Sequence, residues 1–262
     1  QGGWLPAAST LSDNCYHVIF NPERDPVIGA SAVLDGFVIT GGNAVGAVSP
    51  HFQGGGVFND HASPTLRNVV LRGNTANDGG AAVSGIESAA RFENAVMDGN
   101  AADVGGAIYS ENGSPSFVNV TISGNRANYD GGGAFGMDAS FAFVNATLVG
   151  NRAADGSGGG VFCDGGDPRF DYATFSGNAA TSDGGALYCY QSRPTVRNSV
   201  FWGDAADGEG AELARQIAPA HVLGYGHGLR RTSTTRRRCR GADPPEPPCA
   251  APSRCRWRSA RS

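Results

Sequence analysis

The chain has 262 residues, among them 40 glycines and no lysine, and its formal net charge is −4. The charge is unevenly distributed: residues 1–212 carry 9 arginines against 22 acidic residues, whereas residues 213–262 carry 11 arginines against 2. Phosphate binding needs clustered cations, so the acidic, lysine-free first part argues against a nucleic-acid partner. No run of 18 apolar residues occurs, which argues against a membrane-spanning segment.

Residues 1–33 lack a regular pattern and are expected to form an irregular N-terminal segment or a partial rung of the repeat that follows. Within them, residues 13–20 indicate a strand, and the Asn-Pro and Asp-Pro pairs indicate loops. Residues 33–43 have the sequence VLDGFVITGGN and form a degenerate first rung that already ends in Gly-Asn. Residues 44–53 are an inserted loop.

Six near-copies of one unit, each 25 to 27 residues long, then follow without a break. Each unit opens with two glycines, a small residue and an apolar pair, continues with a short apolar-Asn step, and closes on Gly-Asn or, in the last copy, Gly-Asp. The units begin at Gly54, Gly79, Gly105, Gly131, Gly158 and Gly184. Self-similarity at a fixed period of this length predicts a solenoid.

The pattern within a unit predicts β-structure rather than helix. Short alternating apolar runs of three to five residues are separated by glycine and asparagine, which are typical of bends. We therefore predict an all-β fold: a right-handed single-stranded parallel β-helix over residues 34–212, with about seven or eight rungs of about 26 residues stacked at the ordinary interstrand spacing of about 4.8 Å. The glycines supply positive-φ bends, and the asparagines are expected to form hydrogen-bonded ladders.

Stacking converts columns of the repeat alignment into columns in space. Two uniformly apolar columns are predicted to form the core: Leu66, Phe92, Phe117, Phe143, Phe170 and Val196, and Leu71, Met97, Ile122, Leu148, Phe175 and Phe201. In the opening strand either the fourth and sixth or the third and fifth positions could face inward. We favour the fourth, which places Tyr109 and Tyr188 outside; this column is Val57, Ala82, Ile108, Ala134, Val161 and Leu187.

The residues Asn14–Val18 (NCYHV), residues 34–43 and the recurring GGA/GGG and F-x-N elements resemble secreted bacterial right-handed β-helix proteins of the pectin-lyase-like superfamily. The similarity is strongest to surface proteins with polymorphic outer-membrane protein repeats, and it covers about residues 13–212. It implies a β-helix that is secreted or displayed on the cell surface. Such proteins carry further rungs, a cap and often a C-terminal anchor, so the chain is expected to be a fragment.

Aspartates precede the glycine pairs, and Asp103, Asp130 and Asp155 are the candidate catalytic or calcium-binding residues. Arg126 and Arg152 lie beside them, and the resemblance to β-helix polysaccharide lyases implies that an arginine could act as a base next to calcium. The alternative is structural. Asp before Gly is ordinary bend chemistry, the spacing of these aspartates from the Gly-Asn step varies, and exposed salt bridges would explain the arginines.

Cysteines and histidines carry weaker signals. Cys163 and Cys189 occupy equivalent positions one rung apart, so they predict either a disulfide or a buried ladder of free thiols. His17, His51 and His61 show no recognised metal spacing. No metal or cofactor is therefore assigned, and calcium remains the one candidate ion.

Residues 213–262 lose the repeat and are rich in arginine and proline. They are expected to form a disordered tail, natural or read out of frame, rather than a basic arm for polyanions.

These observations favour a secreted or cell-surface protein with a structural and adhesive role that binds an extracellular glycan or a surface protein. The alternative function is a polysaccharide lyase or glycoside hydrolase of the pectin-lyase-like superfamily.

Overall fold

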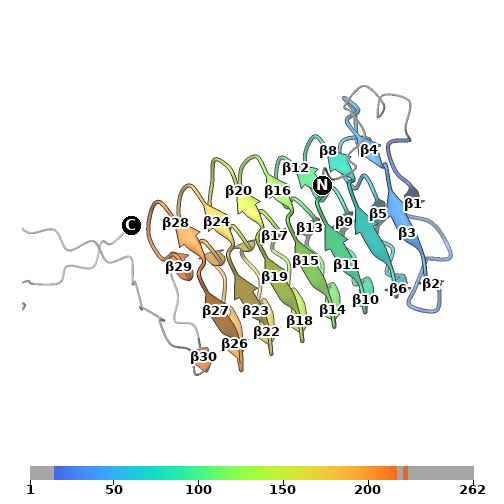
Figure 1. Ribbon diagram of the computed structural model, residues 1–262. Helices are drawn as coiled ribbons and strands as arrows, with labels where there is room; N and C mark the ends of the chain where they lie inside the picture. The colour runs from blue at the N-terminus through green and yellow to red at the C-terminus, as the bar shows by residue number, and fades with distance from the viewer. Residues whose placement is uncertain (1–14, 217–220, 224–262) are drawn as a thin grey trace, which may run out of the picture.

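A computed structural model describes residues 15–216 and 221–223 of the chain. These residues form one elongated solenoid whose regular elements are all β-strands (Figure 1). The predicted all-β fold of stacked parallel strands is thereby confirmed. The predicted tail falls almost entirely outside the described residues.

Each rung contributes one strand to each of four parallel sheets, named A to D in chain order. Sheet A consists of β1 (Ile19–Asn21), β5 (Val57–Asp60), β9 (Val83–Ile86), β13 (Ile108–Glu111), β17 (Ala134–Met137), β21 (Val161–Asp164), β25 (Leu187–Tyr190) and β29 (Leu213–Gln216). Sheet B consists of β2 (Val33–Asp35), β6 (Thr65–Arg67), β10 (Arg91–Glu93), β14 (Ser116–Val118), β18 (Ala142–Val144), β22 (Arg169–Asp171), β26 (Thr195–Arg197) and β30 (His221–Leu223).

The other two sheets have seven strands each. Sheet C consists of β3 (Val38–Thr40), β7 (Val70–Arg72), β11 (Val96–Asp98), β15 (Thr121–Ser123), β19 (Thr147–Val149), β23 (Thr174–Ser176) and β27 (Val200–Trp202). Sheet D consists of the two-residue strands β4 (Asn43–Ala44), β8 (Thr75–Ala76), β12 (Ala101–Ala102), β16 (Arg126–Ala127), β20 (Arg152–Ala153), β24 (Ala179–Ala180) and β28 (Ala205–Ala206).

The regular rungs number about six, slightly fewer than the seven or eight predicted. The difference lies at the two ends. Strands β1 to β4 precede the first glycine unit and belong to an irregular rung, and β29 and β30 belong to an incomplete last one. The sheets thus begin before residue 34 and continue beyond residue 212.

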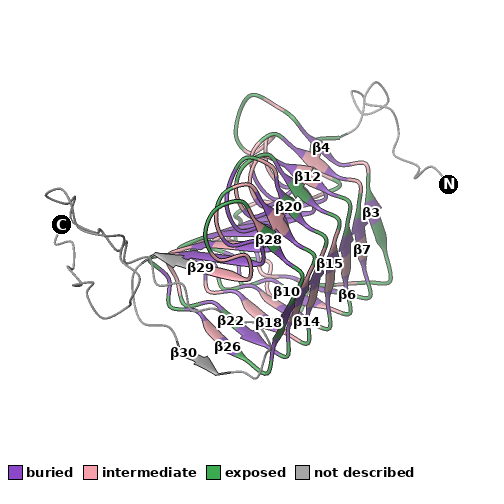
Figure 2. Cartoon of the chain, turned by 60° about the vertical axis from the view of Figure 1, so that its left-hand side comes forward, coloured by how far each residue is buried: buried purple, intermediate pink, exposed green. Residues whose placement is uncertain are grey.

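The interior is a narrow apolar column, as predicted (Figure 2). Both predicted core columns are buried throughout. Phe92, Phe117, Phe143 and Phe170 stack one above another, with ring centroids 5.2, 4.8 and 5.4 Å apart. Each buried large apolar side chain stabilises the fold by about 1.5–3 kcal/mol, so the stacked rungs supply their own core.

In the opening strand the side chain at the favoured fourth position faces inward, but one member of the predicted column is wrong. Ala82 does not belong to that column, because Val83 is the register partner of Ile108. The second unit therefore begins at Gly80, whose φ of 60° is that of the other unit-opening glycines, and Gly79 is an extra residue in the bend. A repeat alignment by letters alone cannot show which glycine of a pair has positive φ.

The predicted asparagine ladder is confirmed inside the solenoid. Nδ2 of Asn125 donates to Oδ1 of Asn151 at 2.9 Å and to the carbonyl oxygen of Met97 at 2.9 Å. The backbone N–H of Asn125 donates to the same Oδ1 at 3.1 Å. Every member is buried, and the ladder runs through Asn74, Asn100, Asn125, Asn151, Asn178 and Asp204.

A second asparagine ladder runs on the outside, at the bend between sheets B and C. Here each amide donates backward, to the preceding rung: Asn94 to Asn68 at 3.2 Å, Asn119 to Asn94 at 3.1 Å and Asn145 to Asn119 at 2.9 Å. All four have φ between 52° and 55°, a conformation that asparagine tolerates better than most residues. In the fifth unit the ladder is interrupted by Tyr172.

Candidate functional site

The three candidate aspartates lie in the bends that lead from sheet D to sheet A, but they do not form one column. The backbone pairing aligns Asp103 with Asn128, Asp155 with Tyr129, and Asp130 with Ser157. The carboxylates thus occupy three different positions along the bend. They do so because the number of residues between the Gly-Asn step and the aspartate varies from unit to unit.

Two of these aspartates have structural partners. Oδ1 of Asp130 accepts a hydrogen bond from the backbone N–H of Ser157 at 2.7 Å, and Oδ1 of Asp103 accepts one from Nδ2 of Asn128 at 2.6 Å. Burial raises the pKa of Asp130, and the Ser157 N–H partly opposes this rise. Asp155 is exposed. Asp103 and Asp130 therefore connect successive rungs, as expected of bend aspartates.

Arg126 and Arg152 are direct register partners in β16 and β20, and both are exposed. Neither guanidinium has an ion-pair partner among the residues that the structure describes, so the expected salt bridges to neighbouring aspartates are wrong. Like charges directly opposite on neighbouring strands repel, so the two side chains extend into solvent.

No group of three or more histidine, cysteine, aspartate and glutamate side chains within the described ranges is arranged to hold a metal ion. A cavity of about 10 Å³ lies inside the solenoid, beside Asn59, Gly85 and Ser110. It has room for about one water molecule and not for a sugar ring.

Cys163 and Cys189 are register partners on the inner side of sheet A. Both are fully buried and both thiols are free, so the structure has the predicted ladder of buried free thiols and not the disulfide. A hydrogen bond to the Cys189 thiol, together with burial, raises the pKa of Cys163. Such a thiol is unreactive in the folded state.

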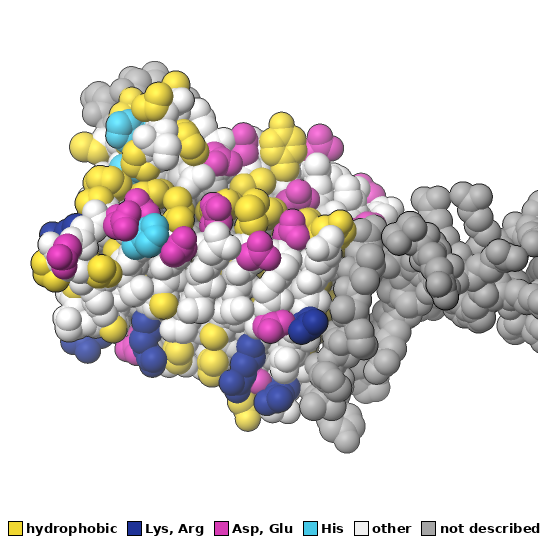
Figure 3. Space-filling model, turned by 180° about the vertical axis from the view of Figure 1, so that it is seen from behind, with side chains coloured by type: hydrophobic (Ala, Val, Ile, Leu, Met, Phe, Trp, Pro, Cys, Tyr) yellow, Lys and Arg dark blue, Asp and Glu magenta, His cyan; other side chains and the backbone are white. Residues whose placement is uncertain are grey.

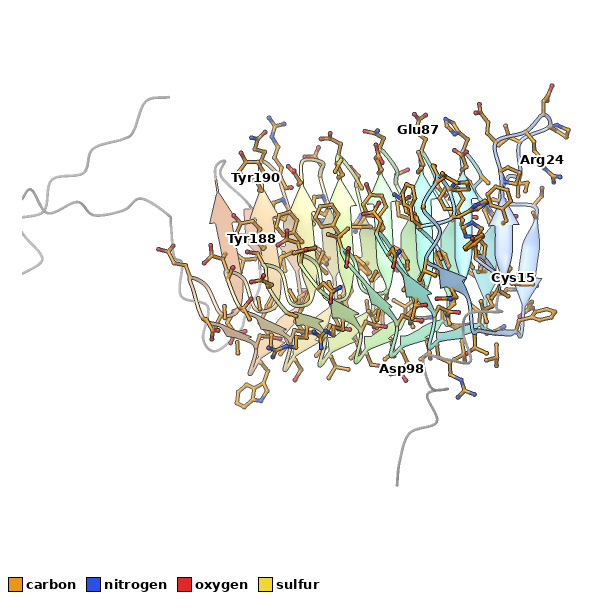
Figure 4. All side chains as sticks on the ribbon, turned by 90° about the horizontal axis from the view of Figure 1, so that it is seen from above. Cys15, Arg24, Glu87, Asp98, Tyr188 and Tyr190 are labelled. Atoms are coloured by element: carbon orange, nitrogen blue, oxygen red, sulfur yellow. The ribbon has the colours of Figure 1, made fainter. Side chains whose placement is uncertain are left out.

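Carboxylates gather instead at the edge of sheet A that leads toward sheet B. The acidic edge consists of Asp60, Glu87, Glu111, Asp138 and Asp164, one from each of five successive rungs. Burial and the nearby Asp138 raise the pKa of Asp164. In Figure 4 Glu87 and Tyr190 project from one margin of the solenoid and Asp98 from the opposite one.

One histidine lies in the acidic edge. Nδ1 of His61 is 2.7 Å from Oδ1 of Asp60, and Nε2 is 3.3 Å from Oε2 of Glu87. The hydrogen bond to Asp60 raises the pKa of His61. The other three carboxylates of the edge, Glu111, Asp138 and Asp164, have no such cation in the described part of the chain.

An aromatic ladder covers the outer face of sheet A beside the acidic edge. Tyr109, Phe135, Phe162 and Tyr188 stack with ring centroids 5.8, 5.0 and 4.9 Å apart. The two tyrosines lie outside the core, as predicted, yet they are only 6% and 9% exposed. The hydroxyl of Tyr109 donates to Glu111 at 3.2 Å, and burial, followed by that carboxylate, raises the pKa of Tyr109. The ladder therefore contacts the acidic edge through Tyr109.

Arginines gather on the outer face of sheet B, and three of them are paired with carboxylates. Arg67 contacts Asp35 at 2.8 Å, Arg91 contacts Glu93, and Arg169 contacts Asp171. Carboxylates without arginine partners therefore lie along sheet A, whereas most of the arginines lie below them in Figure 3, with acidic side chains among them.

A family model for the Chlamydia polymorphic membrane protein repeat matches residues 172–190. This span runs from the bend before β23 to the end of β25. No curated protein and no solved structure gives a significant match. The repeat match and the parallel solenoid together support a β-helix protein with repeats of the polymorphic membrane protein type. They do not support the pectin-lyase-like superfamily in particular.

The acidic edge was missed in the sequence because its members do not share one alignment column. Asp60, Glu111 and Asp164 end the opening strand, whereas Glu87 and Asp138 begin the following bend. The outer aromatic ladder had a visible signal, an aromatic residue at the fifth position of most units.

No helix in the described part of the chain is long and apolar enough to cross a bilayer.

Proposed function

We propose that the protein is a cell-surface β-helix repeat protein with an adhesive role, which binds an extracellular glycan or a surface protein along the side of its rod. The repeat match supports this proposal, since the matched repeat is named for membrane proteins. The solenoid supplies a long, rigid scaffold in which successive rungs hold one another in register.

One observation carries the proposal: inner positions repeat from rung to rung, whereas outer positions of the same strands differ. At the end of the sheet A strands the inner neighbours stay buried in every rung, and the outer residues change from Asp60 to Ile86, Glu111, Met137 and Asp164. Carboxylates recur there although like charges on neighbouring strands destabilise a sheet. A binding role for the outer surface explains why they are tolerated.

The test uses the full chain and a panel of plant, bacterial and host-surface polysaccharides and proteins, with calcium or with a chelator. Co-sedimentation measures retention, and new reducing or unsaturated ends measure cleavage. We expect retention without cleavage. Glu111→Gln with Asp138→Asn should change retention of a charged partner, whereas Arg67→Gln, on another side, should not.

The competing enzymatic function is distinguished in the same assay. Calcium-dependent cleavage that is lost in Asp130→Ala or Arg126→Ala would overturn the adhesive proposal and place a catalytic site on those rungs. Labelling of intact cells with an impermeant reagent tests surface display separately.

A further inference from the structure

The outer asparagine ladder contains one residue that the fold does not favour. Tyr172 has φ of 54°, in the left-handed region that bulky side chains rarely adopt. The equivalent residues in neighbouring rungs are Asn145 and Asn198, which tolerate this conformation. Tyr172 also removes the amide that would continue the ladder, and its side chain is 61% exposed. A strained residue that gains no packing is a candidate functional residue.

A second aromatic departure lies one rung further along the rod. Trp202 ends β27 on the outer face of sheet C and is 69% exposed, whereas its register partner in the preceding rung is Ser176. Val200, on the same face of β27, is 47% exposed and replaces Thr174 of the preceding rung. Exposing a large aromatic side chain is unfavourable in water, so a patch of this kind commonly marks an interaction site.

Tyr172 lies at the bend between sheets B and C, and Trp202 lies on the strand of sheet C in the next rung. The backbone N–H of Tyr172 donates to the carbonyl oxygen of Arg197 at 3.0 Å, which places Tyr172 beside the bend that leads into β27. Trp202 is the fourth residue after that bend position, Asn198, so their Cα atoms are at most about 13 Å apart along an extended chain. Two polar residues lie at the corner between these sheets. Asn198 is exposed at the bend, and Arg197, which ends β26 on the outer face of sheet B, is exposed without an ion-pair partner in the described part of the chain.

We propose that Tyr172, Val200 and Trp202 form a glycan-binding site on which sugar rings stack, with Asn198 and Arg197 as hydrogen-bonding groups for the sugar hydroxyls. This inference rests on the adhesive function proposed above and assigns its glycan partner to a defined place on the rod.

The chemistry of the patch favours a glycan over a protein. Sugar rings present apolar C–H faces to aromatic rings and hydroxyl groups around their rims, so they need separated aromatic platforms with amide and guanidinium groups beside them. A protein partner of comparable affinity would need a wider apolar surface. In the two preceding rungs the same two columns carry Thr147 and Val149, then Thr174 and Ser176, none of which is an aromatic platform.

The test exploits the position of Trp202 and the repeat itself. Trp4→Phe and Trp257→Phe leave Trp202 as the single tryptophan of the full chain, so its emission reports directly on the patch. Soluble oligosaccharides of glucose, xylose, mannose and galactose are titrated into this variant. Tyr172→Asn restores the residue of neighbouring rungs, and Trp202→Ser restores that of the preceding rung. Both substitutions are compatible with the fold.

We expect at least one oligosaccharide to shift the emission of Trp202, and each restoring substitution to weaken its binding at least tenfold while thermal stability is kept or, for Tyr172→Asn, increased. Glycan binding that is unchanged in both variants would overturn this site and leave the adhesive function standing. Failure of every sugar, with retention of a surface protein that the variants abolish, would overturn the glycan assignment. Failure of both glycans and proteins would overturn the adhesive function itself.

Discussion

Asp204 terminates the inner asparagine ladder, and its replacement by asparagine is the sharpest test of how that ladder works. In every earlier rung the ladder asparagine uses its two side-chain atoms differently. Its Oδ1 accepts hydrogen bonds from the asparagine of the preceding rung or the backbone there, and its Nδ2 donates to a core carbonyl oxygen, as Nδ2 of Asn178 does to Leu148 at 2.9 Å. Oδ1 of Asp204 fulfils the first role, accepting from Nδ2 of Asn178 at 2.7 Å. Oδ2 takes the place of that donor and has no hydrogen-bond partner among the residues that the structure describes. The carboxyl group of Glu212 interacts with that of Asp204, and its Oε2 likewise has no hydrogen-bond donor in the described part of the chain.

Burial raises the pKa of Asp204 above its ordinary value of 3.8, although the hydrogen bonds from Asn178 oppose the rise. Burial and the carboxylate of Asp204 likewise raise the pKa of Glu212 above 4.5. A carboxyl group whose pKa is raised by folding binds its proton more tightly in the native state. Its contribution to stability is therefore complete below its unfolded pKa and is lost as the pH rises through the folded pKa.

Asp204→Asn supplies the missing donor at every pH. An unsatisfied buried polar group costs about 1–3 kcal/mol, so we expect the free energy of unfolding to increase by about that amount at neutral pH and by less near pH 4. Urea unfolding of the two proteins at pH 4.5 and 7.5 measures the difference. Asn178→Asp is the matched control and should lose stability as pH rises. An effect of Asp204→Asn that is zero, or equal at both values, would refute the reasoning.

Three further predictions concern the rungs. Asn125→Ala leaves buried donors and acceptors unpaired and should lower the free energy of unfolding by about 3 kcal/mol or more in urea, whereas Asn119→Ala in the exposed ladder should cost less than about 1 kcal/mol. Gly106→Ala places a Cβ 2.3 Å from a backbone oxygen and should prevent folding, judged by circular dichroism, whereas Gly99→Ala meets open space and should cost only about 1–2 kcal/mol for its φ of 60°. Cys163 should resist maleimide until the protein is unfolded, as peptide mass analysis would show; labelling of the native protein would contradict its burial.

Much of the fold could be predicted from the sequence, because in a parallel solenoid each rung repeats the same constraints. Phe117 and Asn125 recur at one spacing since each must contact its own equivalents above and below. The one-residue error in register at Gly79 and Gly80 shows what the repeat pattern cannot predict. Two adjacent glycines are identical as letters, and only backbone conformation distinguishes them.

The candidate site was predicted less well, for a related reason. Asp130 stands before a glycine as a catalytic or calcium-binding residue could, but its carboxylate is engaged by the Ser157 N–H one rung away. The sequence contains no signal for that contact, since the donor is a backbone group. Arg126 was expected to pair with a neighbouring aspartate, and the direction of its side chain could not be inferred from proximity along the chain.

The two asparagine ladders differ in how much a substitution in them costs. The inner ladder is buried and admits no departure before its last member, because each amide there serves the rung on either side. The outer ladder is exposed and lies at a bend whose backbone is already held by pairing between rungs, so one member can be lost at small cost. Tyr172 occurs in the outer ladder, where an aromatic side chain reaches solvent without disturbing the core. The solenoid can therefore acquire a binding residue at a single rung while its neighbours preserve the register, provided that the residue replaces an outer asparagine and not an inner one.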